Sequence, residues 1–271
     1  MSMDRLIDVR VTEIEQLTPL IKRFTLEAAD GDALPTFGAG SHIVVEMTDD
    51  DSVHRSPYSL MGSPWETGPY RIAVRRSENA RGGSRYMHEK VRLGSMLRIS
   101  EPVNLFPLIR TRGKHVLIAG GVGVTPFFAH LAELRAMGLP HELHYAVRNA
   151  EHAGFVDELR LMIGDDLHLY VSDDGQSIDF DALLARQPQG TEVYVCGPER
   201  MVAATIAAAR AAGWHEGRVH AEQFASPAGV PPEVLSTENV SSAGDLCEAG
   251  EGGTARLPRD RRGELAVQEA T

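Results

Sequence analysis

The stretch 116–126 constrains the fold of this chain most. It begins with a short apolar run typical of a buried strand and continues into glycines that include Gly121 and Gly123. Thr125 is expected to cap a helix, and Pro126 to occupy its first turn, where the missing N–H costs nothing. Small residues let a ligand approach the backbone, and a helix start offers free N–H groups to a phosphate. The stretch predicts a dinucleotide cradle, although it departs from the G-x-G-x-x-G pattern; a glycine turn without a ligand is the alternative.

Strand and helix signals alternate from residue 114 onward. The expected strands cover 115–119, 142–147, 167–171, 192–196 and 219–224, and the expected helices cover 125–137, 154–163, 179–186 and 198–212. This alternation predicts βαβ crossovers and a parallel sheet. Ligands bind at the carboxyl ends of such strands, where both the glycines and Cys196-Gly197-Pro198 fall.

Residues 6–110 follow a different pattern, with short branched-rich runs separated by glycine turns. The clearest strand signals are 43–47, 70–74 and 96–99, and a short helix is expected near 84–91. Several short strands at this spacing predict an antiparallel barrel. We therefore expect a β-barrel domain at 1–110 and an α/β nucleotide-binding domain at 111–226. Residues 227–271 shift to Pro, Gly, Ser and charge, which predicts a mobile or poorly packed tail.

Composition excludes several classes of protein. The 271 residues suit two ordinary domains, and a net charge of −11 argues against nucleic acid and anionic membrane surfaces as partners. No secretory signal and no apolar run of membrane-spanning length is visible. Two cysteines, Cys196 and Cys247, give no disulfide framework and fit a reducing cytoplasm.

One barrel segment, 55–60, offers the groups that a flat redox-active ring needs. Tyr58 supplies an aromatic face, Ser59 a hydrogen-bond donor for a reactive nitrogen, and Arg55 a cation for a phosphate. Because alternate residues of a strand point the same way, Arg55 and Ser59 are expected to share one face and Tyr58 to take the other. An ordinary turn-rich strand is the alternative.

A second segment, 80–85, places Gly82, Gly83 and Ser84 at the start of the expected short helix, as an anion nest or as a plain hairpin loop. No metal site is expected. The sequence at 141–144 reads His-Glu-Leu-His, which is not H-E-x-x-H, and it falls on an expected strand. Cys196 lacks an evident base partner for nucleophilic catalysis.

Taken together, six segments resemble the ferredoxin–NAD(P) reductase superfamily, and within it the FMN-containing phthalate dioxygenase reductase and vanillate demethylase reductase type. The resemblance covers about 1–226. In chain order the segments are 55–60, 82–84, 104–108, 120–126, 196–198 and 222–224.

The resemblance implies a flavin-binding barrel and a pyridine-nucleotide domain whose cofactors meet where the two join. By position, Arg55 and Gly82, Gly83 and Ser84 would hold the flavin phosphate. Tyr58 and Ser59 would contact the isoalloxazine, with Ser59 near N5 and Arg75 near the pyrimidine edge. The nucleotide side would comprise Gly121, Gly123, Thr125, Cys196, Gly197 and Pro198, with Phe224 covering the flavin and Glu222 lining the same cleft. Ser59, Cys196 and Glu222 would be the residues beside the reacting rings. Hydride transfer needs close, aligned rings, so most of these residues position rather than react.

The cofactor identities follow from finer features. Gly83 directly before Ser84, and the segment 104–108, resemble the FMN branch, with FAD as the alternative. NADH is expected over NADPH: Arg148 could receive a 2′-phosphate, but Glu151 is close in sequence and no dense basic pocket is apparent.

The tail departs from the family pattern, which usually ends in a plant-type [2Fe–2S] domain with C-x4-C-x2-C and a distant fourth cysteine. Cys247 stands in the first place, but Gly252 and Ala255 occupy the next two. One thiolate cannot hold the cluster, so a degenerate ferredoxin-like remnant without a [2Fe–2S] cluster is expected.

These features predict an enzyme, an NAD(P)H-dependent flavoprotein reductase. It would pass electrons from NADH through FMN to a separate ferredoxin or oxygenase component. A stand-alone flavin or small-molecule reductase is a second hypothesis, and a non-catalytic nucleotide-binding subunit is a third. The sequence does not name the acceptor, the pathway or the oligomeric state.

Overall fold

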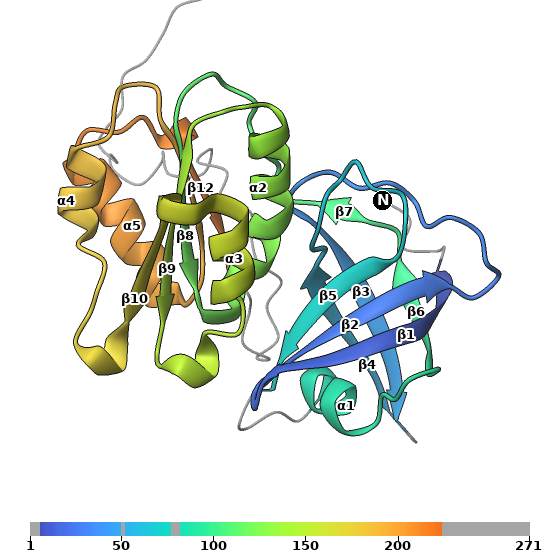
Figure 1. Cartoon of the computed structure of the whole chain (residues 1–271). Coiled ribbons are helices and arrows are strands. Elements are labelled where there is room, and N and C mark those ends of the chain that lie inside the picture. The colour runs from blue at the N-terminus through green and yellow to red at the C-terminus, as the bar shows by residue number, and fades with distance from the viewer. Residues whose placement is uncertain (1–5, 50–51, 77–81, 224–271) are drawn as a thin grey trace, which may run out of the picture. The chain divides into compact units, whose positions relative to one another are not determined.

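The computed structural model describes residues 6–49, 52–76 and 82–223. Its first part is an antiparallel sheet with the strand order β4-β3-β6-β1-β2-β5, and β7 pairs with β3 (Figure 1). The strands are β1 (Leu6–Thr18), β2 (Ile21–Ala28), β3 (Ser41–Asp49), β4 (Ser52–Ser59), β5 (Tyr70–Arg75), β6 (Met96–Ser100) and β7 (Val103–Asn104). An antiparallel bridge between Met61 and Arg71 leads the chain after β4 back to β5, so the sheet curls into the expected barrel-like form.

The barrel core is built from the inward-facing residues of these strands. Val45 and Ile43 of β3 alternate with outward residues and pack against Phe24 of β2 and Ile72 of β5, all fully buried. Helix α1 (Gly83–Glu89) adds Met87 to the same cluster. The expected strands at 43–47, 70–74 and 96–99, and the expected helix near 84–91, are therefore all present.

The second part is a five-stranded parallel sheet with the order β10-β9-β8-β11-β12. Its strands are β8 (His115–Gly120), β9 (His141–Val147), β10 (Leu167–Val171), β11 (Glu192–Cys196) and β12 (Val219–Glu222). Its longer helices are α2 (Thr125–Ala136), α3 (Val156–Ile163), α4 (Phe180–Ala185) and α5 (Glu199–Ala211). Short 3₁₀ turns are η1 (Gly121–Val124), η2 (Ala150–His152), η3 (Gly164–Asp166), η4 (Ser172–Asp174) and η5 (Glu216–Arg218). Every strand and helix expected after residue 114 is present, within a few residues at its ends.

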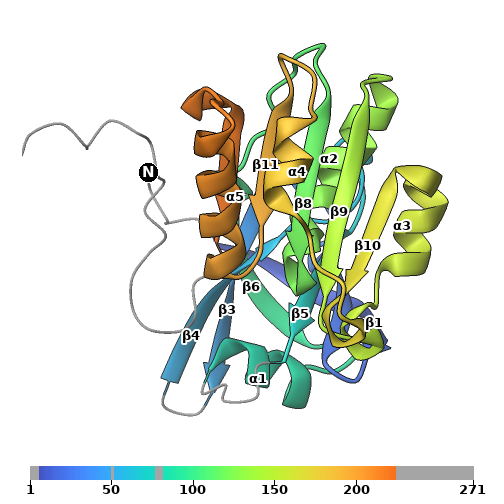
Figure 2. The same cartoon turned by 90° about the vertical axis from the view of Figure 1, so that its left-hand side faces the viewer.

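The helices cover both faces of the parallel sheet, with α2 and α3 on one side and α4 and α5 on the other (Figures 1 and 2). Alternate residues of one strand pack against the helices on opposite faces of the sheet. Leu117 of β8 packs with α2 and α3, whereas Val116 and Ile118 pack with α4 and α5. Cover on both faces explains why the central strand β8 is buried at every residue, without alternation.

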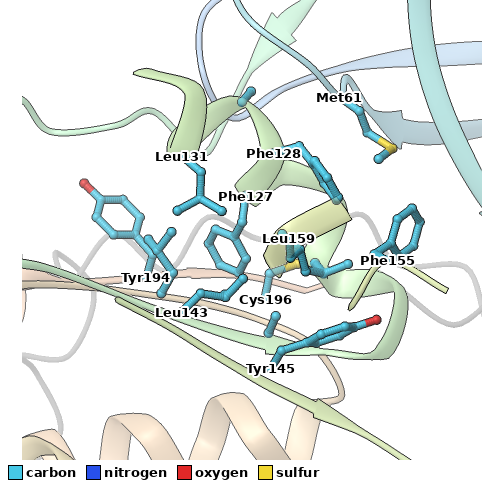
Figure 3. Close-up of a cluster of buried hydrophobic side chains, with 14 of the residues drawn as sticks. Met61, Phe127, Phe128, Leu131, Leu143, Tyr145, Phe155, Leu159, Tyr194 and Cys196 are labelled. Carbon is cyan, nitrogen blue, oxygen red and sulfur yellow. The ribbon is translucent and has the colours of Figure 1, made fainter. Parts of the chain in front are cut away.

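One apolar cluster joins residues of both sheets (Figure 3). Met61 and Ala73 from the antiparallel part belong to the same buried cluster as Phe127 and Phe128 of α2 and Cys196 of β11. Removing a fully buried phenylalanine such as Phe127 typically costs about 3–5 kcal/mol. In the described ranges, no helix is long and apolar enough to cross a membrane.

Candidate functional site

The order of the parallel strands reverses between β8 and β11, because β9 and β10 lie on one side of β8 while β11 and β12 lie on the other. Such a switch point leaves a crevice at the carboxyl ends of the two strands, where α/β folds bind ligands. The glycine turn after β8 and the segment Cys196-Gly197-Pro198 after β11 meet there. A β-carbon on Gly123 would lie 2.4 Å from the carbonyl oxygen of Cys196, and one on Gly197 would lie 3.1 Å from the backbone of Gly120.

Gly121 plays a different part in this turn. It has a φ of +56°, which is the left-handed region that favours glycine, and no atom lies within 4 Å of the place where a β-carbon would sit. The backbone is therefore open to a ligand at Gly121 and closely packed at Gly123. This combination fits a dinucleotide that approaches the turn from the Gly121 side.

Thr125 does not cap the helix as expected. The N-cap residue of α2 is Val124, no side chain caps it, and Thr125 is the first residue of the helix with 2% of its surface exposed. The turn η1 lies between β8 and α2, where a direct entry into the helix was expected. The N-cap therefore lies one residue earlier than predicted. Pro126 does occupy the first turn, as expected.

Cys196 and Glu222 lie side by side on β11 and β12, where they form a register pair. The Cys196 Sγ lies 3.9 Å from a Glu222 carboxylate oxygen. Burial and the neighbouring carboxylate raise the pKa of the Cys196 thiol well above its usual value, so the thiol stays protonated. Burial raises the pKa of Glu222 to about 7, so this carboxyl group holds or releases a proton near neutral pH.

On β4 the residues point as expected. Arg55 pairs with Glu46 and Ser59 with His42 across the β3–β4 ladder, whereas Tyr58 pairs with the core residue Ile43. Paired residues share a face of the sheet, so Arg55 and Ser59 lie on one face and Tyr58 on the other. Burial raises the pKa of Tyr58 to about 12, so its phenol stays neutral.

Ser59 offers a buried hydroxyl at the end of β4. The residue is 4% exposed, and its Oγ has no hydrogen-bond partner in the described part of the chain. A buried hydroxyl without a partner is costly, and a ring nitrogen at this place would satisfy it. The residues present therefore fit a flavin ring at the end of β4.

His42 was not among the residues expected from the sequence. Its Nδ1 is also buried without a hydrogen-bond partner in the described ranges, and burial lowers the pKa of its imidazole. It is the cross-strand neighbour of Ser59. Only the strand register brings His42 and Ser59 together, so no local sequence signal could have identified it.

Arg55 is held by a carboxylate that the sequence analysis also missed. The carboxylate of Glu46, whose side chain is 3% exposed, accepts hydrogen bonds of 2.9 and 2.7 Å from Nε and Nη2 of Arg55 and is also paired with Arg98. Both arginine side chains are more than half exposed. Glu46 therefore orients Arg55 and leaves its Nη1 free of this carboxylate.

The loop before α1 places Gly82 at the N-cap and Gly83 at the first helical position, with Ser84 next. A β-carbon on Gly83 would lie 2.4 Å from Ser56 Oγ, so the loop packs directly on β4. Arg75 ends β5, exposed and opposite Ile21. Phe224, Cys247 and the predicted tail at 227–271 lie outside the described residues, as do residues 80 and 81 of the nest.

The barrel and the parallel sheet touch next to the glycine turn. Strand β5 contacts η1, and Arg23 of β2 donates a 2.6 Å hydrogen bond to Glu158 of α3. The hydroxyl of Tyr194 on β11 accepts a 2.7 Å bond from the backbone N–H of Ile109 in the connecting segment. A separate cavity of about 490 Å³, lined by Gly62, Arg71 and Phe128 among others, contains none of the expected cofactor residues.

Comparison with known proteins identifies the family of this chain. Residues 100–219 match the family described as dimethylamine monooxygenase subunit DmmA-like, N-terminal domain. The carnitine monooxygenase reductase subunit of Escherichia coli (strain K12) is 45% identical over 226 residues, which cover 83% of this chain and 70% of that protein. The chain belongs to the family of oxygenase reductases.

Solved structures agree with this assignment. Phthalate dioxygenase reductase, described as modular for electron transfer from pyridine nucleotides to [2Fe–2S], superposes with a TM-score of 0.76 at 30% identity, covering 83% of this reductase and 70% of that chain. An intact type IV self-sufficient cytochrome P450 monooxygenase gives a TM-score of 0.77 at 34% identity. That alignment covers 83% of this reductase and only 29% of the P450 chain. A further solved neighbour is described as the FAD/NAD-binding domain of nitric oxide dioxygenase from Vibrio cholerae, with a TM-score of 0.71 at 26% identity, covering 80% of this chain and 98% of that one.

Proposed function

We propose that this oxygenase reductase binds FMN in its barrel part, oxidises NADH in its parallel-sheet part, and delivers electrons to a separate ferredoxin or oxygenase component. The observation that carries the proposal is the unpartnered, buried Ser59 Oγ on β4. The open Gly121 turn supports it, because β5 of the barrel adjoins the 3₁₀ turn that contains Gly121. The flavin domain would then span 1–110 and the nucleotide domain 111–226.

Each residue has a positioning role in this proposal. Arg55, oriented by Glu46, and the segment Gly82-Gly83-Ser84 hold the flavin phosphate, while Tyr58, Ser59 and Arg75 contact the ring. Bound flavin supplies the ability to accept a hydride and release electrons one at a time. Gly121, Gly123 and Thr125 shape the nucleotide cradle. Cys196, Gly197, Pro198, Glu222 and Phe224 border the nicotinamide.

A preference for NADH is supported by the carboxylate beside Arg148. Arg148 Nε lies 3.8 Å from Asp173 Oδ1, and Asn149 donates a 3.2 Å hydrogen bond to the other oxygen of the same carboxylate. These residues follow β9 and β10, at the carboxyl edge of the sheet. A 2′-phosphate placed here would meet the charge of Asp173, whereas a ribose hydroxyl could donate to it.

The proposal assigns no iron–sulfur cluster to this chain, because a [2Fe–2S] centre takes four protein ligands and the sequence has two cysteines, one of them buried in β11. We also propose a cytoplasmic location, which suits a free buried thiol.

Turnover with different acceptors tests the proposed function. Purified reductase with NADH is assayed against free FMN, a quinone, a ferredoxin and an oxygenase component. Faster reduction of the protein acceptors supports the proposal. Turnover with free FMN or quinone alone would make the chain a small-molecule reductase. No NADH oxidation with any acceptor, from a protein that stays colourless with FMN and FAD, would make it a non-catalytic subunit.

A further inference from the structure

A cluster of side chains on the parallel sheet lies away from the candidate cofactor site. Glu142 and His144 of β9 and His168 of β10 bring their ligand atoms within 4.8 Å of one another, the one such group found in the described ranges. His168 pairs directly with His144 in the β9–β10 register. Glu142 and His168 are each the second residue of their strand, so the cluster lies near the amino ends of the strands, whereas the cofactor residues follow the carboxyl ends.

Two buried polar atoms, one in this cluster and one on a side chain bonded to it, have no hydrogen-bond partner in the described structure. His144 is fully buried, and its Nε2 has no hydrogen-bond partner in the described structure although it lies 3.2 Å from Glu142 Oε1. Gln187, which follows α4, donates a 2.9 Å hydrogen bond to Glu142 Oε1 while its own Oε1 is buried without a partner. Rotating the amide of Gln187 would bring its oxygen against the carboxylate, so an amide flip does not resolve the deficit.

The other ring nitrogen of His144 is already occupied. Nδ1 lies 2.9 Å from the hydroxyl of Tyr170, which can accept a hydrogen bond from Nδ1, the kind of outer contact that orients a metal-binding histidine. With a proton on Nδ1, the lone pair of Nε2 faces the cluster. The His168 ring stacks on His144 at 4.6 Å between centroids.

We propose that Glu142, His144 and His168 bind a divalent transition metal ion of the Zn²⁺ class, with the amide oxygen of Gln187 as a further ligand. Imidazole and carboxylate donors suit such an ion, with metal–ligand distances of about 2.0–2.2 Å. Donor atoms up to 4.8 Å apart must close by roughly 1 Å to reach that geometry. The partly exposed His168 on the edge strand β10 has the room to make this movement.

Two cations limit the affinity of the site. Lys114 donates a 2.6 Å hydrogen bond to Glu142, and Arg186 is close enough to influence His168 electrostatically. Lys114 bonds to Oε2 of Glu142, whereas Oε1 of the same carboxylate faces His144. One carboxylate can therefore bridge an ammonium group and a metal ion. We therefore expect micromolar rather than nanomolar affinity. The bound ion ties the edge strand β10 to β9 and to the segment after α4, so its role is structural.

The proposal revises the sequence prediction of no metal site. The His-Glu-Leu-His run supplies only two of the ligands, because residues 142 and 144 share a face of β9 while His141 does not. His168 and Gln187 come from distant parts of the chain, which the run itself could not reveal.

Metal titration of the untagged full-length chain, after treatment with a chelator, tests the site. We expect one Zn²⁺ per chain by calorimetry, visible d–d absorbance with Co²⁺, and a rise in Tm of about 5 °C when Zn²⁺ exceeds its Kd 100-fold. His168→Ala should weaken Zn²⁺ binding at least tenfold and abolish the Tm rise. His141→Ala is the matched control, since its ring bonds to the backbone of Leu139 outside the cluster, and it should bind as the parent does.

The rate of NADH oxidation should be the same in His168→Ala and the parent, so failure of this proposal is distinguishable from failure of the proposed reductase function. Absence of Zn²⁺ and Co²⁺ binding by the parent chain would overturn the site. Binding at parental affinity in both His168→Ala and Gln187→Ala would place the metal elsewhere and would also overturn it.

Discussion

The parallel-sheet part builds its candidate site mainly from backbone, whereas the barrel builds its own from side chains. At the switch point, a β-carbon on Gly123 would collide with the opposite backbone, and one on Gly197 would crowd the backbone of Gly120. On the barrel, Ser59, Tyr58 and Arg55 extend from the two faces of one strand, and their polar atoms define the site. Substitutions should therefore act through lost space in the first region and through lost hydrogen bonds in the second.

Gly123→Ala should have the largest effect. Its β-carbon would lie 2.4 Å from the Cys196 carbonyl oxygen, so backbone must move, and we expect a loss of about 3 kcal/mol in the free energy of unfolding. Denaturant unfolding measures it. Gly121→Ala is the control: it has open space but a positive φ, and should cost only about 1 kcal/mol. Equal losses in the two variants would contradict the packing argument.

Arg55→Ala should release flavin. Removing the cation that Glu46 orients should raise the Kd for FMN by about tenfold, the equivalent of about 1.4 kcal/mol for a lost charged hydrogen bond. Fluorescence of released flavin measures this change. Arg98→Ala removes the other arginine on the same carboxylate, and it should leave the Kd within about twofold. If both variants lose flavin alike, the arginines act through the Glu46 network and not through the phosphate.

Ser59→Ala should separate chemistry from binding. Loss of one hydrogen bond in the reacting geometry should slow flavin reduction by NADH by up to about tenfold, with little change in flavin retention. Stopped-flow absorbance under anaerobic conditions measures the rate. A rate equal to that of the parent would remove Ser59 from its assigned position.

Glu222→Gln should change the pH dependence of stability modestly. The pKa of Glu222 is raised from 4.5 to about 7 in the folded chain, so the folded state holds the proton more tightly than the unfolded state does. The contribution of Glu222 is therefore most favourable below pH 4.5 and is lost as the pH rises through 7. The Tm of the variant should therefore rise relative to that of the parent as the pH increases from 4.5 to about 7, and the difference should stay level above that pH. Unchanged Tm differences across that range would show that Glu222 titrates normally.

The same contrast explains what the sequence could predict. In the parallel part, alternating apolar runs and glycines specify strands, helices and the switch-point site, so Gly121, Gly123, Cys196 and Gly197 could be placed from local patterns. The start of α2 differed because η1 intervenes, which shifts the cap from Thr125 to Val124.

In the barrel, the faces of residues 55, 58 and 59 followed from the two-residue period of a strand. The side chains that contact these residues could not be predicted in this way. Glu46, Arg98 and His42 reach β4 only through the register of β3 and β6, which depends on long-range pairing. The Glu142–His144–His168 cluster was missed for the same reason.

In the proposed reaction, a flavin held by the barrel receives hydride from a nucleotide held by the parallel sheet. Anaerobic titration of the purified, flavin-loaded protein with NADH tests it most directly, with the flavin absorbance as readout. We expect about one equivalent of NADH to bleach the flavin completely, since a hydride carries both electrons that the ring accepts. A protein that retains flavin but leaves it unbleached by NADH and by NADPH would contradict it.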